Sequence, residues 1–172
     1  MKKIIYIFIC LITVVPIVSG EDKVFEGFDG MPWGTTIEEF KNKVSNVINL
    51  TTPDNKAANQ SVFVQVNKKG ESVGVVYFFF DNKLFKGRLG DRASEEMLIK
   101  IFTELINTYG MYDEQKEEKD SLNYYWKNSP QFHIVFKYFK KQNNFINIDY
   151  YNPKIVEESN IYKERSKLNL NE

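Results

Sequence analysis

The chain has 172 residues, with 23 basic side chains, 23 acidic side chains and a single cysteine. This length indicates one domain. The balanced charge gives no electrostatic reason to expect nucleic acid or an anionic membrane surface as a partner. Aromatic residues make up 15% of the chain, which is typical of strands that fill a half-buried sheet.

Residues 1–20 have the three parts of a secretory signal. Two lysines form a basic start, an apolar run follows from Ile4 to Ile17, and Val18-Ser19-Gly20 places small residues before a charged segment. This order predicts export and cleavage after Gly20. The apolar run is shorter than the roughly 18 to 20 residues that span a bilayer. A retained anchor, with the signal uncut, is the alternative interpretation.

The only cysteine, Cys10, lies inside this predicted signal. Its apolar neighbour Ile9 and its short lead do not fit a lipoprotein site. After cleavage the chain has no thiol for a disulfide or a metal ligand, and its net charge is −2 because two lysines leave with the signal. A mature chain of this size can fold on its core alone. A disulfide-free exported domain favours a bacterial envelope protein, periplasmic or secreted.

A tight turn around Trp33 follows a short extended lead-in, because glycine and proline flank the tryptophan closely. A threonine at 35 or 36, with a glutamate three residues later, predicts a helix with a capping box. Its apolar stripe is Ile37, Phe40, Val44 and Val47. The polar stretch from Leu50 to Ser61 predicts a loop.

Three strands are expected next, at 62–66, 73–80 and 84–89, with turns at 67–70 and 81–83. A second helix ends at Tyr109, with Gly110 as a left-handed cap. Its predicted buried stripe is Met97, Leu98, Ile101, Phe102, Leu105 and Ile106.

The charged segment 113–120 predicts a solvated connector, and three further strands are expected at 122–127, 132–139 and 145–151. Residues 153–172 predict a C-terminal helix or tail. In chain order the elements are α-β-β-β-α-β-β-β. They predict an α+β domain over residues 21–152, with an antiparallel sheet of about six strands and the helices packed on one face.

The run from Gly30 to Lys41 resembles the start of a broad group of bacterial exported proteins, in which a glycine precedes Trp-Gly, a hydroxyl residue and an acidic helix. Further matching segments are the hairpin 77–84, the helix end 105–110, and Trp126 followed by 132–136. These motifs are structural, so the resemblance implies an exported α+β domain and no particular activity. In architecture alone, the repeated helix and meander is similar to the beta-lactamase inhibitor protein and to small outer-membrane assembly lipoproteins.

Two single residues have both a functional and a structural interpretation. Trp33 on its turn is either an interface anchor or a lock that holds the lead-in against the first helix. His133 is the only histidine, and it is either a catalytic base or a plain sheet residue. The acidic residues of 113–120 lack the glycine and the ligand spacing of a calcium loop. No metal or cofactor is therefore expected.

An open sheet face is the remaining candidate for a site. If helices cover one face only, Tyr125, Phe139, Phe145 and Tyr151 are expected together on the other face, as an apolar binding patch. These observations favour a non-catalytic envelope protein that binds another envelope protein or a peptide, through this face or the Trp33 turn. It would have no nucleic-acid partner and no membrane span after signal cleavage. The alternative is a small hydrolase that uses carboxylates or His133.

Overall fold

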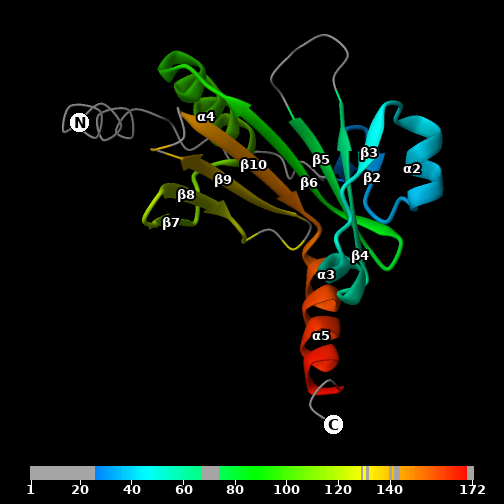
Figure 1. The fold of residues 1–172 in the computed structure, drawn as a ribbon. Coiled ribbons are helices and arrows are strands. Elements are labelled where there is room, and N and C mark those ends of the chain that lie inside the picture. Colours follow the sequence, from blue (N-terminus) through cyan, green and yellow to red (C-terminus); the bar gives the residue numbers. More distant parts are fainter. Residues whose placement is uncertain are drawn as a thin grey trace.

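The computed structural model describes residues 26–66, 74–128, 130, 132–139, 141 and 144–169 (Figure 1). The predicted export signal, with Cys10, and the predicted turn at 67–70 lie outside these residues. The described part is mostly β. It has a large sheet, a two-stranded ribbon of β1 (Gly27–Phe28) and β2 (Met31–Pro32), and four helices.

The large sheet has eight strands in the order β3-β4-β5-β6-β10-β9-β8-β7. Every pairing in it is antiparallel. Most neighbours in the sheet are also neighbours in the chain, as in a meander. The strands are β3 (Val47–Asn49), β4 (Gln60–Gln65), β5 (Gly74–Phe80), β6 (Lys83–Arg92), β7 (Glu114–Glu117), β8 (Ser121–Trp126), β9 (His133–Phe139) and β10 (Phe145–Tyr151).

One long-range pairing joins the two halves of this sheet. Strand β10 lies beside β6, with Arg92 opposite Phe145 at one end and Lys86 opposite Tyr151 at the other. A helix and three strands separate the two elements in the chain. This pairing makes one continuous sheet out of β3–β6 and β7–β10.

The predicted fold class is wrong in its number of strands and in its order of elements. We expected about six strands, whereas eight strands form the main sheet and two more form the ribbon. The missed strands of the main sheet are its two edges, β3 and β7. An edge strand has one hydrogen-bonded neighbour and tolerates charged side chains. The charged segment 114–117 therefore forms a strand without an apolar pattern, and the expected solvated connector is in part an edge.

Helix α2 (Ile37–Lys43) confirms the predicted capping box, in which the Thr36 hydroxyl accepts from the Glu39 amide and the Glu39 carboxylate accepts from the Thr36 amide. The helix is shorter than the predicted stripe, because the backbone is already extended at Val44 (φ −106°, ψ 117°). Val47 consequently lies in β3. In the predicted loop, Pro53–Ala57 forms the short helix α3.

Helix α4 (Glu95–Tyr109) begins at Ser94, whose hydroxyl accepts from the Met97 amide, and ends at Gly110 (φ 80°), so the predicted cap is confirmed. Phe102 and Leu105 are buried against the sheet. Met97, predicted as buried, is 44% exposed. The buried stripe of α4 therefore begins after Met97, later in the helix than the sequence pattern predicts.

Two apolar clusters lie on the same face of the sheet. One joins α4 to β8, β9 and β10, through Phe102, Leu105, Tyr124, Trp126, Ile134, Phe136, Ile146 and Ile148. The other joins α2 and the β1–β2 ribbon to β4, β5 and β6, through Phe28, Met31, Phe40, Phe63, Tyr77, Phe79 and Leu84. We call this side the covered face and the opposite side the open face.

Helix α5 (Pro153–Asn169) departs from the predicted arrangement with all helices on one face. Its first turn packs Ile155 against Phe80 and Phe85, a cluster that also includes Phe78 from the open face. Gln60 of β4 donates to the Ser159 hydroxyl at 2.9 Å. Figure 1 shows α5 projecting from one end of the sheet. The rest of the open face has no described helix packed on it.

Candidate functional site

A cluster of charged side chains lies at the middle of the open face, where β6 and β10 pair. Arg88 is opposite Asp149 in the register, and Lys86 is opposite Tyr151. Arg88 donates from Nε to Asp149 Oδ1 at 2.5 Å and from Nη2 to Oδ2 at 2.9 Å. Lys86 Nζ lies 3.2 Å from Oδ2, and the Tyr151 hydroxyl donates to the same oxygen at 3.0 Å. The four residues form one network around the Asp149 carboxylate.

Local sequence explains how the two cations reach the same face. Lys86 and Arg88 are two residues apart on one strand, so their side chains point to the same side. Between them, Gly87 leaves space on the covered face for the ring of Phe28. The register between β5 and β6 shifts at Phe78 and Phe79. Phe78 is thereby opposite Lys86 on the open face.

Two aromatic rings flank the Lys86 ammonium. Its Nζ lies 4.6 Å from the centre of the Phe78 ring and 4.7 Å from the centre of the Tyr151 ring. The Arg88 guanidinium lies 5.7 Å from the Phe78 ring. These contacts are within the range of cation–π attraction. They also explain why a lysine on a face without a helix is only 14% exposed.

The charges in this cluster shift one another's pKa values. Burial alone would raise the pKa of Asp149, but the hydrogen bond from Arg88 and the charge of Lys86 outweigh it, so the pKa lies below its ordinary value. Burial lowers the pKa of Lys86 to about 8, against the opposing attraction of Asp149. With Lys86 protonated, two cations surround one carboxylate and the cluster has a net charge of +1.

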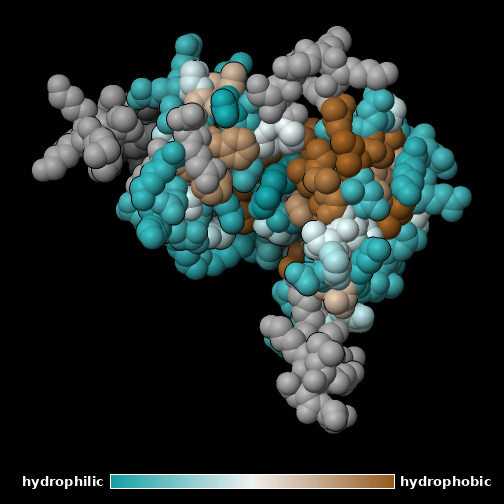
Figure 2. All heavy atoms as spheres, viewed as in Figure 1, coloured by the Kyte–Doolittle hydropathy of each residue, from teal (hydrophilic) through white to brown (hydrophobic). Residues whose placement is uncertain are grey.

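An apolar patch lies directly beside this cluster on the open face. It consists of Ile48, Val62, Val64, Val66 and Val76. In the register, Ile48 is opposite Val64, which is opposite Val76, and Val76 is opposite Arg88. Ile48 is 52% exposed and Val66 is 45% exposed. Figure 2 shows the patch as the brown area over β3, β4 and β5.

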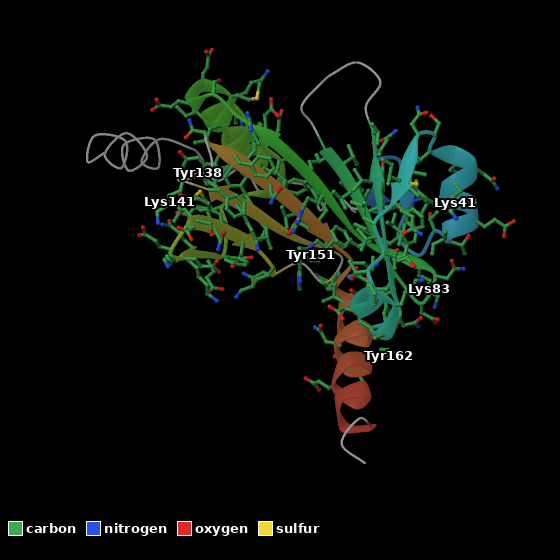
Figure 3. The ribbon with its side chains drawn as sticks, viewed as in Figure 1. Lys41, Lys83, Tyr138, Lys141, Tyr151 and Tyr162 are labelled. Atoms are coloured by element: carbon green, nitrogen blue, oxygen red, sulfur yellow. The ribbon has the colours of Figure 1, made fainter. Side chains whose placement is uncertain are left out.

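The four aromatic residues predicted as a binding patch lie on the open face, but they do not form one apolar surface. Phe139 and Phe145 contact each other, with ring centres 6.1 Å apart. Lys116 and Lys127 lie over the ring of Tyr125, and Lys86 lies over Tyr151. Figure 3 shows Tyr151 near the middle of the molecule, where β10 ends. The continuous apolar surface is instead the patch on β3–β5, and a binding role of these four rings stays a prediction.

Trp33 lies in the turn after β2, partly buried against the cluster beneath α2. Its amide donates to the Glu26 carbonyl at 2.8 Å, and the amide of Gly34 donates to the Leu84 carbonyl at 2.9 Å. Gly34 has a left-handed backbone (φ 84°), so the glycine is needed for this turn. The turn is thus tied to the start of β6, a geometry that favours the structural interpretation of Trp33.

His133 lies on the open face at the start of β9, opposite Tyr151 in the register. Burial lowers its pKa, against a hydrogen bond with the Lys127 backbone and the charge of Asp113. A cavity of about 390 Å³ lies elsewhere, between α4 and the covered face. Its lining includes Leu89, Ile101, Ile146, Ile148 and Tyr150. The histidine and the cavity are therefore on opposite faces of the sheet.

Sequence reasoning missed the Lys86–Arg88–Asp149 cluster. Its one local signal was the alternation Lys86-Gly87-Arg88 within a strand, together with an aspartate inside the apolar strand 145–151.

Glu114 of the acidic segment makes salt bridges with Lys116 and Lys127. Across the described ranges, no group of three or more histidine, cysteine, aspartate or glutamate side chains could hold a metal ion.

Within the same ranges, no helix has both the length and the apolar composition required to cross a membrane. Comparison of the chain with protein-family models, with curated proteins and with solved structures finds no match.

Proposed function

We propose that this protein is an exported, non-catalytic binding module of the bacterial envelope. Its open face binds a segment of another exported protein, in which acidic side chains stand next to apolar ones. The observation that carries this proposal is the direct contact, in one sheet register, between the apolar patch and the cationic cluster at Val76–Arg88. The signal pattern of residues 1–20 and the resemblance of the Trp33 turn to exported proteins support the envelope location.

The apolar patch supports binding because of where it lies. Single exposed apolar residues are common on protein surfaces, but a contiguous patch with polar surroundings marks an interaction surface. Ile48, Val64 and Val76 are successive neighbours across three strands. An extended or helical segment with apolar side chains would remove this surface from water, at a gain of about 25 cal/mol for each Å² buried.

The charges of the open face indicate the sign of the partner. Open-face positions of β6, β7 and β9 hold the basic residues Lys86, Arg88, Lys116 and Lys137. In β6–β10, the acidic residues on this face are Glu114 of β7 and Asp149 of β10. The whole chain has equal numbers of basic and acidic residues. Positive charge is thus concentrated on one surface, and electrostatic complementarity favours an acidic partner.

Binding to defined peptides tests the proposal. The protein, purified after expression of the full chain, is titrated with peptides that combine valine with glutamate, glutamine or lysine. We expect the glutamate peptide to bind most tightly and its affinity to fall as salt is added. We also expect Val64→Gln to weaken binding. The control is Ile99→Gln, because Ile99 is an exposed (39%) apolar residue on α4, away from the open face.

Two outcomes would contradict this function. The first is that none of the three peptides binds to the wild-type protein. The second is that Ile99→Gln weakens binding as much as Val64→Gln does, because the contact would then not be on the open face. Zwitterionic and anionic lipid vesicles serve as a further arm, and tighter binding to vesicles than to any peptide would replace a protein partner by a membrane.

Export is tested separately. When the full chain is expressed in a bacterium and the cells are fractionated, we expect the product in the envelope fraction. Its mass should correspond to a chain that begins at Glu21. A cytoplasmic product that still begins at Met1 would contradict the proposed location, whatever the peptides do.

A further inference from the structure

In the central cluster, the Asp149 carboxylate is fully hydrogen-bonded, whereas the two cations have donors left over. Both oxygens of Asp149 are occupied, since Oδ1 accepts from Arg88, and Oδ2 accepts from Arg88, Lys86 and Tyr151. An ammonium has three N–H donors and a guanidinium has five. Lys86 uses one of its N–H donors on Asp149, and Arg88 uses two. Among the described residues no second acceptor is bonded to either side chain.

The two cations that carry the surplus positive charge are poorly exposed to water. The Lys86 side chain is 14% exposed between the rings of Phe78 and Tyr151, and Arg88 is 30% exposed. A partly buried cation without a full counter-charge is unfavourable. The lowered pKa of Lys86 reflects this cost, because burial makes the protonated side chain less stable than it would be in water. One further negative charge at this point would neutralise the cluster.

We infer that Lys86 and Arg88 form a subsite that binds one carboxylate of the partner segment, with Asp149 and Tyr151 as positioning residues. This inference rests on the function proposed above and names the group that the partner must present. Asp149 binds Nε and Nη2 of Arg88 and so fixes the plane of the guanidinium. The N–H groups that Asp149 does not use then point in fixed directions. The single negative charge of a carboxylate matches the single surplus positive charge.

The place of the subsite in the sheet indicates the source of the carboxylate. The apolar patch lies on one side of it, over β3–β5. Val135, Lys137 and Tyr125 continue the open face on the other side, over β9 and β8. A bound segment can therefore extend in both directions across the subsite. The carboxylate belongs to an internal aspartate or glutamate, and not to the end of a chain.

A cycle of protein and peptide variants tests this subsite. The peptides are capped at both ends, contain valines beside one central residue, and carry glutamate or glutamine at that residue. We expect the wild-type protein to bind the glutamate peptide about tenfold more tightly than the glutamine peptide. In Lys86→Gln this ratio is expected to fall close to one. The control Lys83→Gln, at an exposed position in the hairpin before the site, should keep the tenfold ratio.

Arg88→Lys provides a second variant, because it keeps a cation beside Asp149 while removing the outer donors of the fork. It is also expected to reduce the ratio. Thermal unfolding of each variant identifies those that have lost the fold, and the ratio is compared only among proteins that unfold cooperatively. A ratio that stays at tenfold in both Lys86→Gln and Arg88→Lys would overturn the subsite.

Failure of the subsite can be distinguished from failure of the proposed function. If both peptides bind equally well to the wild-type protein, and Val64→Gln weakens both, the open face binds peptides but has no carboxylate subsite. If neither peptide binds, the proposed function itself fails. Two further peptides test the assignment to an internal carboxylate: an uncapped peptide with glutamine at the centre, and a phosphoserine peptide. Tighter binding of either one than of the glutamate peptide would overturn that assignment.

Discussion

The ring of Phe28 lies against Gly87 so closely that a Cβ at this position would be 2.1 Å from two of its ring carbons. Phe28 comes from the β1–β2 ribbon, and Gly87 stands between the two cations of the candidate subsite. The same strand position therefore connects the packing of the covered face with the geometry of the open face.

Gly87→Ala is expected to destabilise the protein by about 1–3 kcal/mol, because the new methyl group must displace a buried ring. Gly74→Ala is the matched control, since it is also a strand glycine but the nearest atom to its added Cβ lies 3.9 Å away. Urea unfolding measures both variants. Equal midpoints for the two would show that Phe28 has room to move.

Asp149→Asn is expected to lower the free energy of unfolding by about 3–5 kcal/mol. The change keeps the shape of the side chain but leaves the buried Lys86 and the partly buried Arg88 without a counter-charge. Glu114→Gln, which breaks salt bridges of an edge strand, should change it by less than about 1 kcal/mol. If Asp149→Asn unfolds at the wild-type urea concentration, the buried network contributes no stability.

Acid should weaken the same network. The pKa of Asp149 lies lower in the folded protein than in the unfolded chain, so its carboxylate contributes its full stabilisation above the ordinary aspartate pKa. This contribution is lost as the pH falls through the lower, folded pKa. We therefore expect the stability difference between wild type and Asp149→Asn to be constant near neutral pH and to shrink below about pH 4. A difference that grows with acid would contradict the pairing.

Lys86 should give a dependence of the same sign in mild alkali, where stability again rises with pH. Its pKa of about 8 in the folded protein is below its ordinary value, so from pH 8 upward the unfolded chain binds more protons than the folded one. Stability therefore rises with pH in this range, by about 1 kcal/mol from pH 8 to pH 9. Among the groups that face it, Asp149 stays ionised and Arg88 stays protonated in this range, and burial raises the pKa of Tyr151 well above it.

The measurement compares wild type with Lys86→Met over pH 7.5–9. Several buried tyrosines have raised pKa values and will destabilise the folded state near and above pH 10, so higher pH is excluded. We expect the free energy of unfolding of the wild type to gain on that of the variant as the pH rises. Parallel curves would mean that Lys86 titrates normally.

Asn123 offers a test of a buried polar group. It is fully buried on the open-face side of β8, and neither its amide nitrogen nor its amide oxygen has a hydrogen-bond partner. An unsatisfied buried polar group costs about 1–3 kcal/mol. Asn123→Leu, which has nearly the same shape, should therefore raise the free energy of unfolding by about 1 kcal/mol in urea. A loss of stability would show that the amide is satisfied in solution.

The sequence predicted those features that depend on residues close together in the chain. The capping box of Thr36 and Glu39 needs four residues, and the end of α4 needs one glycine after an apolar stripe. Strands β4, β5 and β9 are rich in apolar and aromatic side chains. Strand β7 is charged and β3 has only three residues, and both lie at the edges of the sheet, where a strand obtains its hydrogen bonds from one neighbour.

The amino-acid sequence by itself determined the turn at Trp33, the end of α4 at Gly110 and the central strands, because each depends on interactions within a few residues. Only the tertiary structure decided that β10 lies beside β6, and therefore that Asp149 meets Arg88 across 61 positions of the chain. The same pairing places the Lys86 ammonium over the ring of Tyr151, whereas Lys116 lies over Tyr125 because β7 pairs with β8. A contact between distant strands depends on the register of the whole sheet, which no local pattern specifies.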